Sequence, residues 1–146
     1  MYKFKLIDGP NLNMLGIRNP AVYGTTTLAE IENELTEYGF TKGVSLDCFQ
    51  SNSEGAIIDE IHSCHKRYDA IIINAGAYTH YSYAIRDAIE AVEIPAAEVH
   101  LSDIHKREEF RHISVIEPVC CIQICGRGKQ GYFDALDELI KIIRNA

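Results

Sequence analysis

Short apolar runs alternate along the chain with longer segments in which apolar residues recur at helical spacing. Strands are predicted at about residues 3–7, 44–49, 70–73, 94–98 and 119–125. The run at 70–73 is continuously apolar, which is typical of a strand buried on both faces of a parallel sheet. The pattern therefore predicts a parallel sheet that is covered by helices.

Helices are predicted between these strands and after the last one. Thr27 and Glu30 form a capping box, and the helix that they begin should end at Gly39. Two more helices should begin near Ser53 and Ser82, and a last one should follow the glycine-rich turn at 126–131. The side chains expected on their buried faces are Leu28, Ile31, Leu35, Tyr38, Ile57, Ile58, Ile61, Cys64, Ala84, Ile85, Ala88, Ile89, Val92, Phe133, Leu136, Leu139, Ile140 and Ile143.

This alternation, without repeats or linkers, predicts one catalytic domain over residues 1–146. The favoured fold is α/β, an open, doubly wound, five-stranded parallel sheet of flavodoxin-like order. Ligands of such sheets bind beyond the carboxyl ends of the strands. Polar segments follow the first four strands, at 11–23, 51–53, 74–80 and 98–111, so a ligand site is predicted at that edge.

Composition narrows the class of partner. The formal net charge of -7 argues against nucleic acid, which needs clustered Lys and Arg, so a small-molecule substrate is expected. No apolar run has the length of a membrane span, and the first residues read as a strand rather than a signal peptide. No membrane partner and a cytoplasmic location are therefore expected.

The five cysteines are expected to be reduced, because their number is odd and no secretory signal precedes them. Cys120, Cys121 and Cys125 could suggest a metal site. On an extended strand, however, Cys121 and Cys125 would lie roughly 13 Å apart, and Cys120 would face the other way. These cysteines are therefore interpreted as small core residues.

A flavodoxin-like sheet can carry a flavin, a phosphoacceptor aspartate or a catalytic pocket. The loop after the first strand lacks a Ser/Thr/Gly-rich phosphate turn, and the turn at 126–131 matches no nucleotide-binding fingerprint. A phosphorelay receiver would need an aspartate where this chain has Asn74. His80, His100 and His105 raise the possibility of zinc, but their spacing does not show convergence, so neither a metal nor a cofactor is expected.

The segment from Glu98 to His112 concentrates acids, histidines and arginines after a buried strand. Residues two apart on a strand point to the same side, so Glu98 can hold the His100 ring, keep one nitrogen protonated and favour the imidazolium. This pair is interpreted as a general acid and its orienting carboxylate. The alternative is a solvated charged loop with a histidine at the end of a strand.

Arg18 and Tyr23 offer the complementary base. A phenol has a pKa of about 10, and a neighbouring guanidinium favours the tyrosinate and lowers that pKa. A base and an acid together are the equipment for an elimination reaction. Without Arg18, Tyr23 would more often be an ordinary surface aromatic residue.

Six groups of residues occur in order along nearly the whole chain and resemble one known family. They are GPNLNMLG (9–16), Arg18 with Pro20 and Tyr23-Gly24, QSNSEG (50–55), NAGAYTH (74–80), EVHLS (98–102) and REEFR (107–111). The chain is identified by them as resembling the type II 3-dehydroquinate dehydratases. The resemblance implies the flavodoxin-like fold and trans elimination of water from 3-dehydroquinate through an enolate, without metal or Schiff base. That step serves aromatic biosynthesis or quinate breakdown.

The resemblance also implies roles for individual residues. Tyr23 corresponds to the general base, Arg18 to the residue that stabilises its tyrosinate, and Asn11 to the asparagine that stabilises the enolate through a water. His100 corresponds to the general acid, oriented by Glu98. The residues implied around the substrate carboxylate and ring hydroxyls are Asn74, Leu101, Ser102, His80, Arg111, Asp87 and, with a less defined role, Arg107.

Asp8, Asn19 and Asp103 depart from the family pattern. Asp8 would place a negative charge near the enolate unless it is protonated or faces away. The resemblance further implies trimers stacked into a homododecamer, with Asp87 entering a neighbouring site. The competing hypothesis is a non-catalytic flavodoxin-like binding or assembly subunit.

Overall fold

The computed structural model describes residues 1–17 and 19–146, with only the backbone of Tyr23, and it contains one five-stranded parallel sheet. The strand order is β2-β1-β3-β4-β5, which is the flavodoxin-like order that the sequence predicts. The strands are β1 (Tyr2–Asp8), β2 (Val44–Gln50), β3 (Ala70–Asn74), β4 (Ala96–His100) and β5 (Ile122–Cys125).

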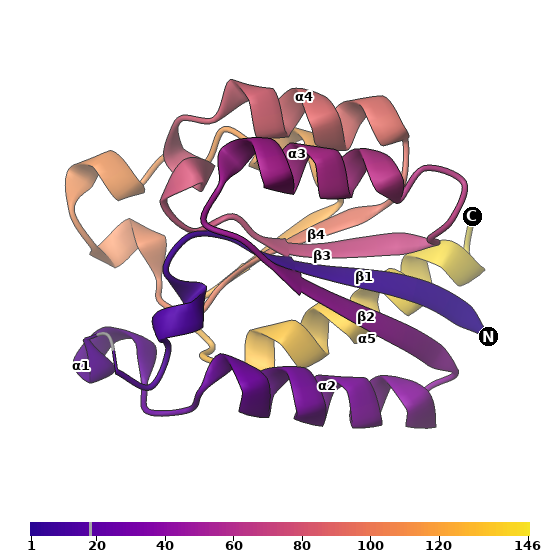
Figure 1. The fold of residues 1–146 in the computed structure, drawn as a ribbon, viewed down its shortest axis with the longest axis horizontal. Coiled ribbons are helices and arrows are strands. Elements are labelled where there is room, and N and C mark those ends of the chain that lie inside the picture. Colours follow the sequence, from indigo (N-terminus) through magenta and orange to yellow (C-terminus); the bar gives the residue numbers. More distant parts are fainter. Residues whose placement is uncertain (18) are drawn as a thin grey trace.

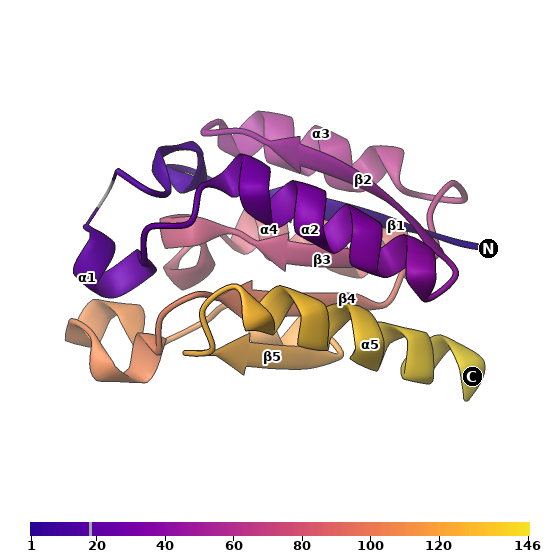
Figure 2. The ribbon, with the colours of Figure 1, turned by 90° about the horizontal axis from the view of Figure 1, so that it is seen from below.

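Helices cover both faces of the sheet (Figures 1 and 2). The pair α3 (Glu54–Ser63) and α4 (Tyr83–Val92) lies on one face, and α2 (Leu28–Thr41) and α5 (Gln130–Arg144) lie on the other. The short helix α1 (Pro20–Tyr23) and the 3-10 turns η1 (Leu12–Met14), η2 (Gly76–His80), η3 (Ile104–Lys106), η4 (Glu109–Arg111) and η5 (Glu117–Val119) lie in the connections. None of the helices in the described part of the chain is long and apolar enough to cross a membrane.

Side-chain caps begin three of the four long helices. The Thr27 hydroxyl accepts from the Glu30 amide at 3.2 Å, and Ser53 and Ser82 cap α3 and α4 in the same way. Each cap satisfies an amide that has no partner within the helix, which fixes where the helix begins after its loop.

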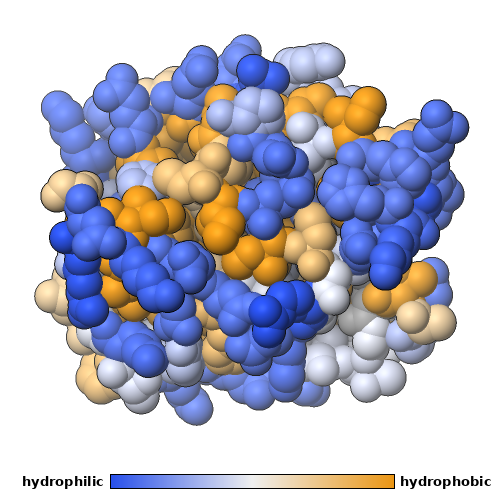
Figure 3. All heavy atoms as spheres, turned by 180° about the vertical axis from the view of Figure 1, so that it is seen from behind, coloured by the Kyte–Doolittle hydropathy of each residue, from blue (hydrophilic) through white to orange (hydrophobic). Residues whose placement is uncertain are grey.

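The alternating side chains of the strands build two separate cores. Phe4, Leu6 and Ile72 pack toward α2 and α5, whereas Ile7 and Ile73 pack toward α3 and α4. The sheet is therefore apolar on both faces, as the continuous run at 70–73 predicts. Strand β5 forms an edge and its residues are only half-buried; in the view from behind, apolar groups reach the surface among hydrophilic ones (Figure 3).

Two predictions about the helices are wrong. Helix α2 continues through Gly39 to Thr41, because Gly39 is a packing glycine whose added Cβ would lie 3.2 Å from Leu136. The left-handed turn that follows the helix is at Gly43 instead. Ala84 is exposed rather than buried, because it lies on the outer side of α4.

The cysteines follow the prediction only in part. Strand β5 begins at Ile122, so Cys121 lies before it and is exposed, while Cys120 and Cys125 are half-buried. Only Cys64 is a fully buried core cysteine, and all five thiols are free.

Candidate active site

A pocket opens at the carboxyl ends of β1, β3 and β4, the edge at which the polar segments predict a site. The pocket is partly open, and the space between its atoms, including the solvent at its mouth, is about 470 Å³. The residues that line it are Pro10, Asn11, Leu12, Asn74, Gly76, Ala77, His80, His100, Leu101, Ser102, Ile104, Arg107 and Arg111.

Two glycines bring the loops after β1 and β3 into direct contact. A Cβ on Gly9 would lie 2.7 Å from the backbone of Ala75, and a Cβ on Gly76 would lie 2.9 Å from the carbonyl oxygen of Pro10. Gly76 also has a positive φ of 58°, which other residues rarely adopt. Bare backbone at both positions therefore lets the two loops close one wall of the pocket.

The polar residues after β2 support this wall from outside the pocket. The Gln50 amide donates to the carbonyl of Gly9 at 3.1 Å, and the Asn52 side chain accepts from the backbone N–H of Asn11 at 3.0 Å. Ser53 caps α3 and does not line the pocket. Asn52 thus positions Asn11, and the segment 51–53 does not form part of the pocket surface.

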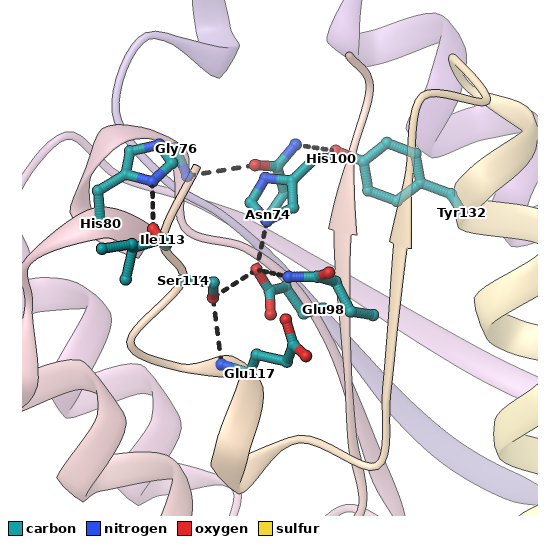
Figure 4. Close-up of polar contacts among 10 residues, drawn as sticks. Asn74, Gly76, His80, Glu98, His100, Ile113, Ser114, Glu117 and Tyr132 are labelled. Atoms are coloured by element: carbon teal, nitrogen blue, oxygen red, sulfur yellow. Dashed lines mark hydrogen bonds and ion pairs between the residues drawn. The ribbon is translucent and has the colours of Figure 1, made fainter. Parts of the chain in front are cut away.

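Glu98 lies behind His100, as the strand spacing predicts (Figure 4). Its side chain is fully buried, and its Oε2 accepts from His100 Nε2, from Ser114 Oγ at 2.8 Å and from Gln123 Nε2 at 3.2 Å. An ionised carboxylate can only accept, so Nε2 carries a hydrogen, and Nδ1 is the ring nitrogen left for chemistry in the pocket. The carboxylate therefore fixes both the tautomer and the orientation of the ring.

His80 stands on the other side of the pocket. Its Nδ1 lies 2.8 Å from the carbonyl oxygen of Ile113, so Nδ1 must donate (Figure 4). Burial lowers the pKa of His80 below its usual value, which favours the neutral ring with Nε2 as an acceptor. Such a ring is suited to accept a hydrogen bond from a hydroxyl group.

The charged side chains of the pocket lining are all cationic. Arg107 and Arg111 lie in the connection after β4, and Arg111 is held by Glu108, which accepts from its Nε at 2.7 Å. The described lining residues include no Asp or Glu. Both arginines pair with Glu108, which lies outside the lining. Guanidinium groups match carboxylates in geometry and charge, so these two favour an anionic ligand.

A series of buried, hydrogen-bonded side chains leads from Asp8 through Tyr132 to Asn74 in the pocket lining. Tyr132 Oη donates to Asp8 Oδ1 at 2.6 Å, and Asn74 Nδ2 donates to Tyr132 Oη at 3.0 Å. Burial raises the pKa of Asp8 to about 7, and Asp8 is not part of the pocket lining. The departure at Asp8 therefore places a carboxyl beneath Asn74 rather than beside a ligand.

The structure brings most of the site residues predicted from the sequence to one pocket. Eight of them line it: Asn11, Asn74, His80, His100, Leu101, Ser102, Arg107 and Arg111. Glu98 lies directly behind His100, and Asp87 is exposed on α4, away from the lining residues. Arg18 and the side chain of Tyr23 lie outside the described part of the chain, so the proposed base stays a prediction.

Sequence reasoning missed the residues that hold the functional side chains. Gln123 lies beside Glu98 in the β4–β5 register, and Ser114 reaches Glu98 from the connection before η5. Tyr132 reads as one more apolar residue of the last helix, although its hydroxyl joins Asp8 to Asn74. Only the polar Gln123 within an apolar strand gave a signal in the sequence.

No three His, Cys, Asp or Glu side chains of the described residues cluster as metal ligands would. His105, one of the three histidines considered for zinc, is exposed in η3.

Comparison with known proteins gives one consistent result. The family model "Dehydroquinase class II" matches residues 2–140. A 3-dehydroquinate dehydratase of Bacillus cereus is 55% identical over 146 residues, covering 100% of both chains, and that of Anoxybacillus flavithermus is 53% identical over 143 residues, covering 98% of this chain and 97% of the relative.

Solved structures agree with these relatives. The type II dehydroquinase of Butyrivibrio crossotus is 52% identical, with a TM-score of 0.94 over 95% of this chain and 97% of that one. The type II dehydroquinase of Propionibacterium acnes is 38% identical, with a TM-score of 0.93 over 97% of both chains. The similarity thus covers sequence and fold over nearly the full length.

Proposed function

Since this chain belongs to the class II dehydroquinase family, we propose that it is a hydro-lyase that converts 3-dehydroquinate to 3-dehydroshikimate. The observation that carries this proposal is the pocket itself: a histidine held by a buried carboxylate faces a lining whose charged side chains are all cationic. The substrate is a carboxylate with ring hydroxyls, and it loses water through acid–base chemistry. The step would serve aromatic biosynthesis or quinate breakdown.

Substrate binding would begin with the carboxylate. Asn74 and the turn at Leu101–Ser102 line the same part of the pocket, and amide N–H groups can donate to an anion. The turn is fixed because the Leu101 carbonyl accepts from the Gly128 amide at 3.0 Å. His80 and Arg111 would hold the ring hydroxyls, and Arg107 would add positive charge.

The first chemical step would remove a proton from the carbon beside the ketone. In this proposal the tyrosinate of Tyr23, stabilised by the Arg18 guanidinium, takes that proton. The electrons of the C–H bond move to the ketone oxygen and form an enolate. Asn11, which lines the pocket, would stabilise the enolate oxygen through a water molecule.

The second step would expel the hydroxyl group next to the carboxylate. The enolate electrons form the new C=C bond, the C–O bond breaks, and protonated His100 delivers a proton so that water leaves. Glu98 supports this role because its Oε2 holds Nε2 and leaves Nδ1 for the leaving group. Transfer of the proton from Tyr23 back to His100 would restore the starting state.

A direct assay tests the reaction. Purified protein with 3-dehydroquinate should generate the ultraviolet absorbance of the conjugated enone of 3-dehydroshikimate. Activity should survive exhaustive chelation, and borohydride added with substrate should leave no covalent adduct. A folded preparation that produces no enone would support the non-catalytic subunit instead, and a metal requirement or a trapped Schiff base would refute the mechanism.

We also propose that the site is completed between subunits. Asp87 is exposed on α4 and does not line the pocket of its own chain, and large apolar side chains are exposed at the start of α4 and around η4. They are Tyr81, Tyr83, Phe110 and Ile113. A homododecamer of four trimers, with Asp87 entering a neighbouring pocket, would account for both features.

Mixing subunits tests the shared site. Asp87→Ala and Arg18→Ala proteins should each be inactive, and hybrid trimers reassembled from both should regain part of the activity, since some sites then contain both wild-type residues. Mass measurement must confirm reassembly. A fully active monomer, or confirmed hybrids without activity, would exclude the model.

A further inference from the structure

The buried chain from Asp8 through Tyr132 to Asn74 has no part in the proposed chemistry, yet it ends at the pocket. Asp8 and Tyr132 are both fully buried, on β1 and α5, and Asn74 is the last residue of β3. Figure 4 shows the Asn74 amide between the Tyr132 hydroxyl and Gly76. Three elements that are distant in sequence thus meet at one side-chain amide.

The hydrogen bonds of this chain have a fixed direction. Tyr132 has one hydroxyl hydrogen, and an ionised Asp8 takes it at 2.6 Å. Toward Asn74 the phenol therefore presents a lone pair, which requires an N–H donor, and Asn74 Nδ2 supplies it at 3.0 Å. At the other end, the Gly76 N–H donates to Asn74 Oδ1 at 3.2 Å.

This direction decides what Asn74 offers to a ligand. An amide nitrogen carries two hydrogens, and Tyr132 uses one, so the second N–H is left for the pocket. If the amide rotated by half a turn, Oδ1 would face the phenol lone pair and Nδ2 would face the Gly76 N–H. Two acceptors would then face each other at Tyr132, and two donors would face each other at Gly76.

We propose that Asp8 and Tyr132 are positioning residues that hold the Asn74 amide with an N–H toward the pocket, and so set its affinity for an anionic substrate. This inference rests on the proposed function and adds to it two residues that touch no ligand. Their effect should appear in substrate binding more than in turnover.

The ionisation of Asp8 gives the arrangement a pH dependence. Burial raises the pKa of Asp8 to about 7, and the nearby Glu32 carboxylate adds to this rise, while the Tyr132 hydrogen bond opposes it. Cys48 on β2 also faces Asp8, and burial raises the pKa of its thiol to about 12, so the thiol stays neutral. Burial also raises the pKa of Glu32, so the Asp8→Asn variant is needed to assign a pH effect to Asp8.

Protonation of Asp8 removes the fixed donor and acceptor roles in the hydrogen bonds between Asp8, Tyr132 and Asn74. A neutral carboxyl can donate to the phenol oxygen, which frees the phenol hydrogen to point toward Asn74. The amide is then held in the orientation with N–H toward the pocket only by the Gly76 N–H, which still donates to Asn74 Oδ1. The Michaelis constant should therefore rise as the pH falls below 7, in addition to any effect of the histidines in the pocket.

The test compares Tyr132→Phe with wild type and with Tyr38→Phe. Tyr38 is a matched control because its hydroxyl also donates to an aspartate, Asp137, at 2.7 Å, between α2 and α5 and outside the pocket. Loss of one hydrogen bond that holds the amide should raise KM by about tenfold with kcat changed by less than about threefold. Tyr38→Phe should leave both constants unchanged.

Asp8→Asn provides the second arm and does not depend on Tyr132→Phe folding. Its side chain does not titrate, so its KM should not vary with pH through position 8. Between pH 8 and 6, wild type should show a rise in KM that Asp8→Asn lacks, because Asn cannot titrate. Identical pH profiles of KM would overturn the inference.

The remaining outcomes are distinguishable. An active wild type with an unchanged KM in Tyr132→Phe, or with a loss confined to kcat, overturns the positioning role and leaves the proposed function standing. A wild type without turnover overturns the proposed function, and the inference falls with it.

Discussion

Replacing Asp8 by Asn should change how the stability of the protein depends on pH. Asp8 is completely buried, its Oδ2 has no partner among the described residues, and burial raises its pKa from 3.8 to about 7. The folded protein therefore keeps the proton over a range in which the unfolded chain releases it. Within that range, the free energy of unfolding falls as the pH rises.

The magnitude follows from the two pKa values. Each unit of difference corresponds to about 1.4 kcal/mol, so the full shift corresponds to roughly 4 kcal/mol. Between pH 4.5 and 7 the wild type should lose about 3 kcal/mol of unfolding free energy through this one group. Above pH 8 the loss should level off, because Asp8 is then ionised in both states.

The assay is urea unfolding of both proteins at half-unit steps from pH 4.5 to 8.5, followed by circular dichroism. Groups shared by both proteins cancel in the difference, so the stability of Asp8→Asn relative to wild type should increase by about 3 kcal/mol from pH 4.5 to 7. Asp59→Asn, on the exposed side of α3, controls for removal of a carboxylate. A difference that stays constant within about 0.5 kcal/mol would refute the reasoning, because it would mean that Asp8 ionises alike in both states.

Three further predictions concern the site. Tyr23→Phe should lower kcat by about 100-fold to 10,000-fold in a folded protein, because it removes only the ionisable oxygen; a loss under tenfold would exclude Tyr23 as the base. His100→Ala should slow net dehydration more than proton exchange beside the ketone, measured by NMR in heavy water, and an equal fall in both would exclude a specific acid role. Gly9→Ala should destabilise the protein by about 1–3 kcal/mol in urea unfolding, because its Cβ would meet backbone at 2.7 Å. Gly55→Ala, whose Cβ meets nothing closer than 3.9 Å, should not destabilise it, and equal effects of the two changes would contradict the packing argument.

The elements and their order could be predicted because the signals that define them are local. Periodicity, caps and turn residues indicate each strand and helix, and the alternation of the two restricts the sheet to few topologies. The same logic brought Asn74 and His100 to one edge, since both end parallel strands. Residues of the pocket that follow such strands are therefore accessible to sequence reasoning.

The supporting contacts could not be predicted, because they depend on register and depth. Gln123 meets Glu98 only because β5 pairs with β4 in one particular register. Tyr132 lies 124 positions from Asp8, and nothing local indicates that its hydroxyl reaches that carboxyl. Gly39 shows the same limit, since a glycine that permits packing and a glycine that ends a helix look alike in a sequence.

At Gly9 and Gly76 the backbones of two loops touch without intervening side chains, and this has a consequence for engineering. One wall of the pocket contains contacts that no side chain can replace, so both positions should appear intolerant in a mutational scan although neither contributes a functional group. The connection at 101–111 is different, because five of its residues line the pocket from one continuous segment: Leu101, Ser102, Ile104, Arg107 and Arg111. A library aimed at new substrates should keep the two glycines constant and diversify that segment.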